Sequence, residues 1–346
     1  MINQRISDLA FFYPIGHEAH YQAGHVERPE RVETIRKVLQ SNGWWDKYPN
    51  LNSASIPESV LYKVHDPTWI VELESLCRQS SSLGLDSYLT PSTYKLALNA
   101  AGGAAEVALS IWRGEARRGF ALTRPPGHHA TYRQGGGFCY INNIAIAAEM
   151  LLQEGHVSRL AIVDYDLHHG NGTQDIFWKR SEVLYISTHQ MPLYPGTGWI
   201  TEIGEGNGEG TTANFPLQAG SGDQAFRTIS NELVMPLLDR FRPEMILVSF
   251  GFDTHWLDPL GSLLLSASEY TQLISSLVHW AEKYCNGKVV LVLEGGYDLQ
   301  AASACASGVT AALLDQNWED PLGPAPYKEQ PGWQRMVSQA KKIWRV

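Results

Sequence analysis

Residues 160–172 read Leu-Ala-Ile-Val-Asp-Tyr-Asp-Leu-His-His-Gly-Asn-Gly. The run begins with continuously apolar residues, partly β-branched, which is typical of a central strand that is covered on both faces. We expect this strand over residues 160–164, with Asp164 as its last residue, and Asp166 and His168 follow where it would end. Ligands of parallel α/β sheets bind outside the carboxyl ends of the strands. This stretch therefore predicts a parallel sheet with a functional site at its edge.

Similar short apolar runs occur elsewhere in the chain, at residues 9–13, 119–123, 183–188, 245–250 and 289–293. Helical periodicity lies between them, at residues 31–39, 93–112, 141–153, 223–241, 268–284 and 300–314. This alternation predicts an α/β fold of three layers, α/β/α, with a mostly parallel central sheet. Without an internal repeat or low-complexity linker, we expect a single domain over residues 1–346, with a core at about 9–314 and a tail, 315–346, packed on it.

The composition indicates a globular protein, because 44% of the 346 residues are hydrophobic. The net charge of −9 argues against a general nucleic-acid binder and mildly favours a cationic substrate. The N-terminus lacks the apolar core of a signal peptide, and no run approaches the ~20 apolar residues that span a membrane. We expect a cytoplasmic protein without nucleic-acid or membrane partners; the sequence leaves the oligomeric state open. The cysteines lack CxxC spacing, so we expect them reduced and mostly buried.

Polar groups stand at the ends of several predicted strands. His128 and His129 follow residues 119–123, Asp253 follows residues 245–250, and Tyr297 follows residues 289–293. Because the carboxyl ends of parallel strands share one edge of a sheet, we expect these side chains to converge on one crevice together with Asp166 and His168.

Three of these residues form a candidate metal site. Asp166 and His168 are two apart in extended chain, so both side chains can reach one cation, and Asp253 is the natural third ligand. Two carboxylates and one imidazole leave a coordination position open for water and substrate. This set favours zinc, with iron(II) or manganese as alternatives. The opposing interpretation is that a lone strand-end aspartate caps a helix or turn, which the clustered histidines disfavour.

We assign no catalytic role to the other polar stretches of the sequence. We expect His17, His20 and His25 to be surface or satisfied core histidines. The irregular stretch 189–223 is rich in glycine, but its glycines at 204–210 lack the strand–loop–helix order and closing Lys-Ser/Thr of a phosphate-binding loop. A long functional loop is favoured there.

Motifs at four places stand in a characteristic order: residues 124–130 (Arg-Pro-Pro-Gly-His-His-Ala), 137–143 (Gly-Phe-Cys-Tyr-Ile-Asn-Asn), 164–174 (Asp-Tyr-Asp-Leu-His-His-Gly-Asn-Gly-Thr-Gln) and 294–297 (Glu-Gly-Gly-Tyr). The chain thereby resembles the zinc-dependent histone deacetylase and acetylpolyamine amidohydrolase family, of the class II type. The resemblance runs from residues 25–32 to about residue 314 and implies an arginase/deacetylase-like fold.

The resemblance implies a role for each matching residue. Asp166, His168 and Asp253 match the zinc ligands, and Tyr297 matches the tyrosine that polarises the amide carbonyl. His128 and His129 match a tandem pair that Asp164 and Asn171, respectively, are expected to hold. Of this pair, we expect His129 to move the proton, because neutral Asn171 raises its proton affinity less than Asp164 raises that of His128.

The same resemblance implies sites around the metal. Phe138 and Tyr194 match the aromatic walls of an acyl-lysine tunnel, with Gly137 at its side. Arg31 matches an arginine that lines an inner channel. A structural site for a monovalent cation, K⁺ or Na⁺, matches Asp164, Asp166, His168 and Ser187.

The resemblance favours a deacetylase acting on lysine side chains of peptides or proteins over three alternatives. A non-catalytic acetyl-lysine-binding relative is expected to lack Tyr297, a ligand or a tandem histidine. A two-manganese enzyme of the arginase type needs extra carboxylates where this chain has Asn171. Polyamine deacetylases of the family tend to carry an acidic residue at the rim, where this chain has Leu260. Asp86 or Ser87 is a candidate for holding the substrate backbone there.

Overall fold

The computed structural model describes residues 6–84, 86–153 and 156–346. Within these ranges an eight-stranded sheet has the order β2-β1-β5-β10-β9-β6-β7-β8, and every neighbouring pair is parallel. The strands are β1 (Ser7–Phe12), β2 (Asn50–Leu51), β5 (Ala116–Ala121), β6 (Leu160–Asp164), β7 (Val183–Gln190), β8 (Thr212–Leu217), β9 (Ile246–Phe250) and β10 (Val289–Leu293). The short strands β3 (Ser82–Leu83) and β4 (Ser87–Tyr88) form a separate hairpin.

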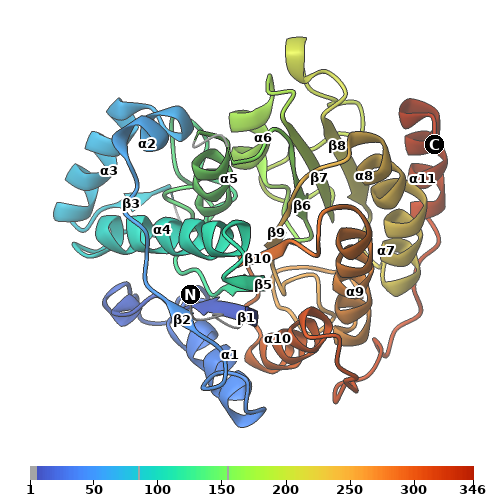
Figure 1. Ribbon diagram of the computed structural model, residues 1–346, viewed down its shortest axis with the longest axis horizontal. Helices are drawn as coiled ribbons and strands as arrows, with labels where there is room; N and C mark the ends of the chain where they lie inside the picture. The colour runs from blue at the N-terminus through green and yellow to red at the C-terminus, as the bar shows by residue number, and fades with distance from the viewer. Residues whose placement is uncertain (1–5, 85, 154–155) are drawn as a thin grey trace.

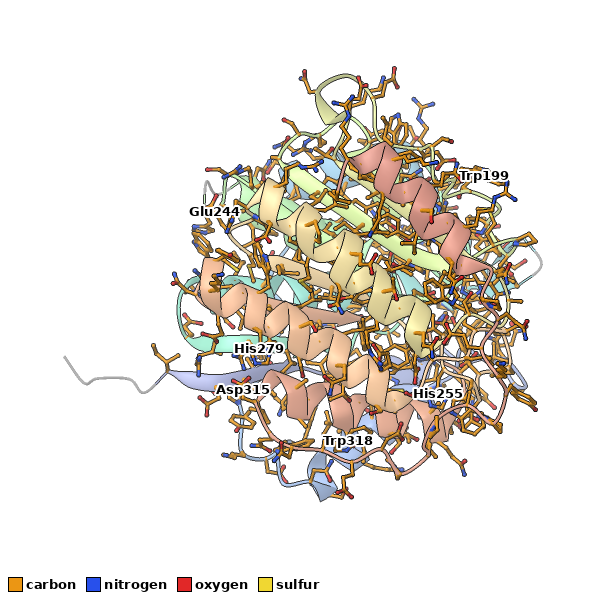
Figure 2. The ribbon with its side chains drawn as sticks, turned by 90° about the vertical axis from the view of Figure 1, so that its right-hand side faces the viewer. Trp199, Glu244, His255, His279, Asp315 and Trp318 are labelled. Carbon is orange, nitrogen blue, oxygen red and sulfur yellow. The ribbon has the colours of Figure 1, made fainter. Side chains whose placement is uncertain are left out.

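Helices cover both faces of the sheet, as the alternating pattern predicts (Figure 1). One face carries α2 (Glu58–Val64), α3 (Pro67–Arg78), α4 (Thr93–Trp112), α5 (Asn143–Gln153) and α6 (Asn171–Phe177). The other carries α1 (Glu30–Ser41), α7 (Asp223–Ile229), α8 (Met235–Phe241), α9 (Ala267–Tyr284), α10 (Leu299–Leu313) and α11 (Trp333–Trp344). Figure 2 looks onto this second face, where α11, the α7–α8 segment and α9 lie side by side. The three-layer α/β/α fold with a parallel sheet is confirmed.

Alternation along the central strands divides their side chains between two hydrophobic cores. In β6, Ala161 and Val163 belong to the core under α7–α11, whereas Leu160 and Ile162 belong to the core under α2–α5. Both faces of the strand are therefore buried, which is why its sequence is apolar throughout rather than alternating. Within the described ranges, no helix combines the length and apolar character that crossing a membrane requires.

The structure corrects several expected elements. The stretch 189–223 contains β8, which pairs with β7 at the sheet edge, together with a short 3₁₀ turn (η2, Gly206–Gly208). The helix expected over residues 223–241 is divided into α7, a π-helical turn (η3, Ser230–Val234) and α8. Pro236 lies at the start of α8 and has no N–H to donate, so a regular hydrogen-bond ladder cannot run through it. Helices α2, α3, α6 and α11 and strand β2 were not predicted.

The residues after 315 contribute to the main core. Trp333, Val337 and Trp344 of α11 are buried in the same cluster as the sheet residues of that face. The four cysteines are free and buried, as expected.

Gly103 of α4 lies directly on the ring of Phe12 in β1, and a Cβ there would sit 2.3 Å from ring carbons. We expect Gly103→Ala to destabilise the protein by about 1–3 kcal/mol through overpacking, which exceeds the ~1 kcal/mol that alanine gains in helix propensity. Chemical denaturation measures the change. Lys95→Ala, exposed on the same helix, is the matched control and should stay within about 0.5 kcal/mol of wild type. A Gly103→Ala protein as stable as wild type would contradict this packing.

Candidate active site

The segments that carry the predicted site residues follow neighbouring strands of the sheet. Strands β5, β10, β9 and β6 lie next to one another in that order. His128 follows β5, Tyr297 follows β10, Asp253 follows β9, and Asp166 follows β6. All four strands run in the same direction, so these loops meet at one edge, as the sequence predicts (Figure 1).

Asp166, His168 and Asp253 form a group that fits a metal ion. One ligand atom from each lies within 4.8 Å of the other two. His168 Nδ1 is 3.3 Å from Asp166 Oδ1 and 3.3 Å from Asp253 Oδ2. Asp253 Oδ2 is buried, and among the described residues it accepts no hydrogen bond. A buried carboxylate oxygen without a donor is costly unless a cation satisfies it, so this donor set suits a divalent metal.

Hydrogen bonds from neighbouring loops orient the two aspartates. Asp253 Oδ1 accepts the Leu167 N–H at 3.0 Å, and Asp166 Oδ2 accepts the Gly295 N–H at 2.8 Å. Such contacts fix the carboxylates before a metal binds.

Two glycines pass so close to these carboxylates that no side chain fits. A Cβ at Gly251 would lie 2.0 Å from Asp166 Oδ2, and one at Gly295 would lie 2.1 Å from Asp253 Oδ2. Any larger residue at either place would displace a candidate ligand.

The tandem histidines lie beside this group and have different partners. Their ring centroids are 4.1 Å apart. His128 Nδ1 is 3.2 Å from Asp164 Oδ2, and His129 Nδ1 is 2.7 Å from Asn171 Oδ1. These are the partners that the resemblance implies.

Their surroundings separate the proton affinities of the two imidazoles. Burial by itself lowers the pKa of His128, but the carboxylates of Asp166 and Asp164 outweigh it and raise that pKa to about 10. Burial and the positive charge of His128 hold the pKa of His129 well below its usual value. One imidazole therefore favours the charged form and its neighbour the neutral form.

Tyr297 is almost fully buried, 7% exposed, between two contacts. The Arg31 guanidinium lies 4.8 Å from its ring centroid, and the Phe138 ring meets it edge-on at 5.8 Å. Burial, opposed by the charge of Arg31, raises the pKa of Tyr297 well above its usual value. The phenol therefore keeps its proton at neutral pH and is a hydrogen-bond donor.

The two predicted aromatic walls lie against different site residues, Tyr194 against His129 and Phe138 against Tyr297. The half-exposed Tyr194 ring meets the His129 ring edge-on at 4.9 Å. Gly137 lies between Tyr194 and His129, because its Cβ would be 2.8 Å from the first ring and 2.4 Å from the second. Phe138, the next residue, lies against Tyr297. Tyr194 and the bare backbone of Gly137 thus lie against His129, and Phe138 lies against Tyr297.

Three residues were predicted to lie at the rim, and each contacts other parts of the protein. Leu260 is half-buried and packs against the core, and its N–H donates to Asp258 Oδ1 at 3.0 Å. Ser87 is buried rather than open to substrate, and its hydroxyl accepts the Phe138 N–H at 3.0 Å. Asp86 is exposed and accepts a hydrogen bond from His25 through its main-chain oxygen at 2.8 Å.

Asp164 and Ser187 are paired across β6 and β7. The Asp164 carboxylate accepts from His128, from Tyr185 Oη–H at 3.1 Å and from the Asp166 N–H at 3.1 Å. The monovalent-cation site at Asp164, Asp166, His168 and Ser187 stays a prediction.

Arg31 belongs to a buried charge cluster that the sequence analysis missed. Its guanidinium donates to Glu27 Oε1 at 3.1 Å, to the Gly296 carbonyl at 2.6 Å and to the Glu294 carbonyl at 2.5 Å. Arg124 donates to both carboxylate oxygens of Glu27, at 2.9 and 3.0 Å. Burial raises the pKa of Glu27, but Arg124 and Arg31 outweigh it and lower that pKa to about 2. Glu27 lies before α1, which begins at Glu30, so no helical periodicity in the sequence signals this pair.

His17 and His20 are buried near this cluster, and His25 lies against the Phe138 ring at 4.8 Å. His20 Nδ1 is 2.8 Å from Thr93 Oγ1, and His25 makes hydrogen bonds through both ring nitrogens. The expectation of a satisfied histidine describes the half-buried His25 alone. His17 Nδ1 and His20 Nε2 are buried without a hydrogen-bond partner among the described residues.

Known proteins match this chain over most of its length. The sequence model of the histone deacetylase domain matches residues 25–313. A probable deacetylase of Archaeoglobus fulgidus is 38% identical over 322 residues, covering 92% of this chain and 89% of the relative. The histone deacetylase-like amidohydrolase of Pseudomonas aeruginosa is 35% identical over 302 residues, covering 85% of this chain and 80% of that relative. The chain belongs to the histone deacetylase family.

A solved structure agrees with this membership. The crystal structure of the HDA15 HD domain matches with a TM-score of 0.89 and 32% identity, covering 98% of this chain and 94% of that one. The resemblance read from the motifs is confirmed, and a hydrolase of the deacetylase or amidohydrolase kind is supported. The individual site assignments rest on the geometry above and stay predictions.

The metal site yields a direct test. We expect Asp253→Ala to reduce bound divalent metal from about one per chain to nearly none, because one of three ligands and its charge are lost. Elemental analysis of the purified protein measures this, and circular dichroism checks the fold. Asp239→Ala, which removes a half-exposed surface aspartate, should keep its metal. Full metal occupancy in Asp253→Ala would refute the ligand assignment.

Proposed function

We propose that this protein is a zinc-dependent amidohydrolase that removes acetyl groups from lysine side chains of peptides or proteins and releases acetate. One observation carries the proposal: a metal-fitting group, a tandem histidine pair and a protonated buried tyrosine converge at one edge of the sheet. Membership in the histone deacetylase family supports the reaction type.

The residues divide the work of amide hydrolysis among them. Asp166, His168 and Asp253 would hold the cation, which supplies Lewis-acid chemistry that activates water and polarises a carbonyl. Tyr297 O–H donates to the carbonyl oxygen as negative charge develops on it, so this hydrogen bond is stronger in the transition state than in the ground state.

His129 is suited to move the proton. Its Nδ1–H donates to the neutral Asn171 oxygen, so in the neutral imidazole Nε2 is left with a free lone pair. Nε2 accepts a proton as the water oxygen bonds to the acetyl carbon, and returns it to the amine nitrogen as the C–N bond breaks. His128, held by Asp164, supplies positive charge beside the developing oxyanion.

Two features favour a lysine in a polypeptide over a free polyamine. A hollow of about 570 Å³ adjoins Gly137 and Tyr194 and reaches Glu72 and Asp86, which gives room for polypeptide next to these two residues. Leu260, at the position where polyamine deacetylases of the family tend to be acidic, offers no charge to a distant ammonium. Acetylpolyamine or another small N-acyl amine is the alternative substrate class.

We expect Tyr297→Phe to lower kcat by about a hundredfold or more, which is the scale of losing one oxyanion donor. Metal content and KM should stay close to wild type, because the ring and its packing remain. Steady-state kinetics on an acetyl-lysine peptide measure both constants. Near wild-type turnover in this variant would exclude the assigned role, and loss of metal would point to a structural one.

For substrate choice, wild type should hydrolyse acetyl-lysine peptides with a higher kcat/KM than N8-acetylspermidine. Leu260→Glu should shift the ratio towards the polyamine by about fivefold, because a carboxylate near a bound ammonium is worth ~1 kcal/mol at a partly solvated site. Leu260→Gln is the uncharged control for loss of packing. A higher kcat/KM of wild type for N8-acetylspermidine than for the peptide would contradict the proposed substrate preference. Equal peptide-to-polyamine ratios of kcat/KM in Leu260→Glu and Leu260→Gln would contradict the role of charge at this position.

A further inference from the structure

Glu294 is a fully buried glutamate that the mechanism above does not use. It follows β10 directly, and β10 lies between β5 and β9 in the sheet. Its side chain bonds to both sides. Oε2 accepts the N–H groups of Gly127 at 2.7 Å and His128 at 3.1 Å, in the turn after β5, and Oε1 accepts the Ser249 hydroxyl of β9 at 3.0 Å. Both oxygens are therefore satisfied.

The turn that Glu294 holds is the one from which both tandem histidines project. On its other side, the His128 carbonyl accepts the N–H groups of Gly172 at 3.0 Å and Thr173 at 3.1 Å. Gly127 is pressed against the start of α5, because a Cβ there would lie 2.4 Å from the Asn143 nitrogen. The main chain of this turn is thus held on two sides. The His128 carbonyl bonds to the start of α6, and the N–H groups of Gly127 and His128 bond to Glu294 after β10.

We propose that Glu294 is a positioning residue for the tandem histidines. Its carboxylate fixes the backbone of Gly127 and His128, and so sets where the imidazoles of His128 and His129 stand relative to the reacting amide. The inference rests on the proposed amide hydrolysis, in which these imidazoles act. A misplacement of about 1 Å in a group of this kind costs on the order of a hundredfold in rate.

A different role for the residue fits its contacts less well. His128, Cys139 and Glu294 bring possible ligand atoms within 4.8 Å of one another, which would suit a second metal. Both Glu294 oxygens already accept hydrogen bonds, however, and His128 Nδ1 faces Asp164. Binding a metal would compete with these hydrogen bonds. The N–H groups of Gly127 and His128 would then be buried without an acceptor, which is costly.

Glu294→Gln and Glu294→Ala separate the hydrogen bonds from the charge. In Glu294→Gln the amide oxygen accepts both main-chain N–H groups and the NH₂ donates to Ser249 Oγ, so we expect kcat to stay within about threefold of wild type. In Glu294→Ala the clamp is lost, and we expect kcat to fall by about tenfold to a hundredfold. KM in this variant should stay within about twofold and metal content at wild-type level, because neither ligands nor rim are touched.

Thr123→Val is the matched control for losing a buried hydrogen bond in the same region. The Thr123 hydroxyl donates to the Leu293 carbonyl at 2.5 Å and does not touch the histidine turn. This variant should lose stability but keep kcat. A similar fall of kcat in Thr123→Val and Glu294→Ala would make the effect of Glu294 one of general stability and overturn the proposal.

Hydrogen–deuterium exchange provides a readout that does not depend on activity. A peptide spanning residues 124–131 should exchange faster in Glu294→Ala and at the wild-type rate in Glu294→Gln. Unchanged exchange of this peptide in Glu294→Ala overturns the proposal. A kcat in Glu294→Gln as low as in Glu294→Ala also overturns it, because the effect would then come from the charge of Glu294 and not from its hydrogen bonds. A wild type that hydrolyses no acetylated amine refutes the proposed function alone, because the exchange result still decides whether Glu294 holds the turn.

Discussion

Buried carboxylates that accept main-chain N–H groups from neighbouring loops are the interaction on which this site depends. Asp253 accepts from Leu167, and Asp166 accepts from Gly295. Asp258 extends the same pattern, because its Oδ2 accepts the N–H of Tyr297 at 2.7 Å. A carboxylate without donors or a cation would be costly to bury, so each of these side chains requires the loop next to it to be in place. The loops at the strand ends are therefore mutually fixed rather than independently placed.

The electrostatic difference between the two histidines follows from this arrangement. Both are buried and adjacent, but His128 Nδ1 faces the Asp164 carboxylate and His128 lies near Asp166, whereas His129 Nδ1 is bonded to the neutral amide of Asn171. The carboxylates outweigh the burial of His128, and nothing comparable opposes the burial of His129. The carboxylates of Asp166 and Asp164 around one imidazole, and the positive charge of that imidazole beside the other, thus give the two neighbours opposite preferences for a proton. One imidazole can therefore supply positive charge while its neighbour keeps a lone pair that can accept a proton.

The sequence predicted those parts of the molecule whose signals are local. Strand β6 was predicted with its observed bounds, because a short unbroken apolar run with β-branched residues, followed by polar residues, is typical of a strand buried on both faces. Strand β8 was missed because Pro216 and the glycines before it resemble a loop, and its pairing with β7 compensates for them only in the folded sheet. The contacts of Glu294 could not be predicted at all. Its partners Gly127 and His128 are 167 and 166 residues away, and no periodicity records such a separation.

The two glycines before Tyr297 lie where the surrounding atoms leave no space for a side chain. Gly295 passes against Asp253 Oδ2, where a Cβ would lie at 2.1 Å, so no side chain fits on that side. Gly296 has φ = 107°, a conformation that side chains disfavour, and its carbonyl accepts from Arg31 at 2.6 Å. The chain therefore runs between a candidate metal ligand and a buried guanidinium with room for backbone alone. Arg31 in turn is held by Glu27, which Arg124 binds with two hydrogen bonds. The position of the tyrosine hydroxyl is thereby set by a glutamate and two arginines that never need to touch the substrate.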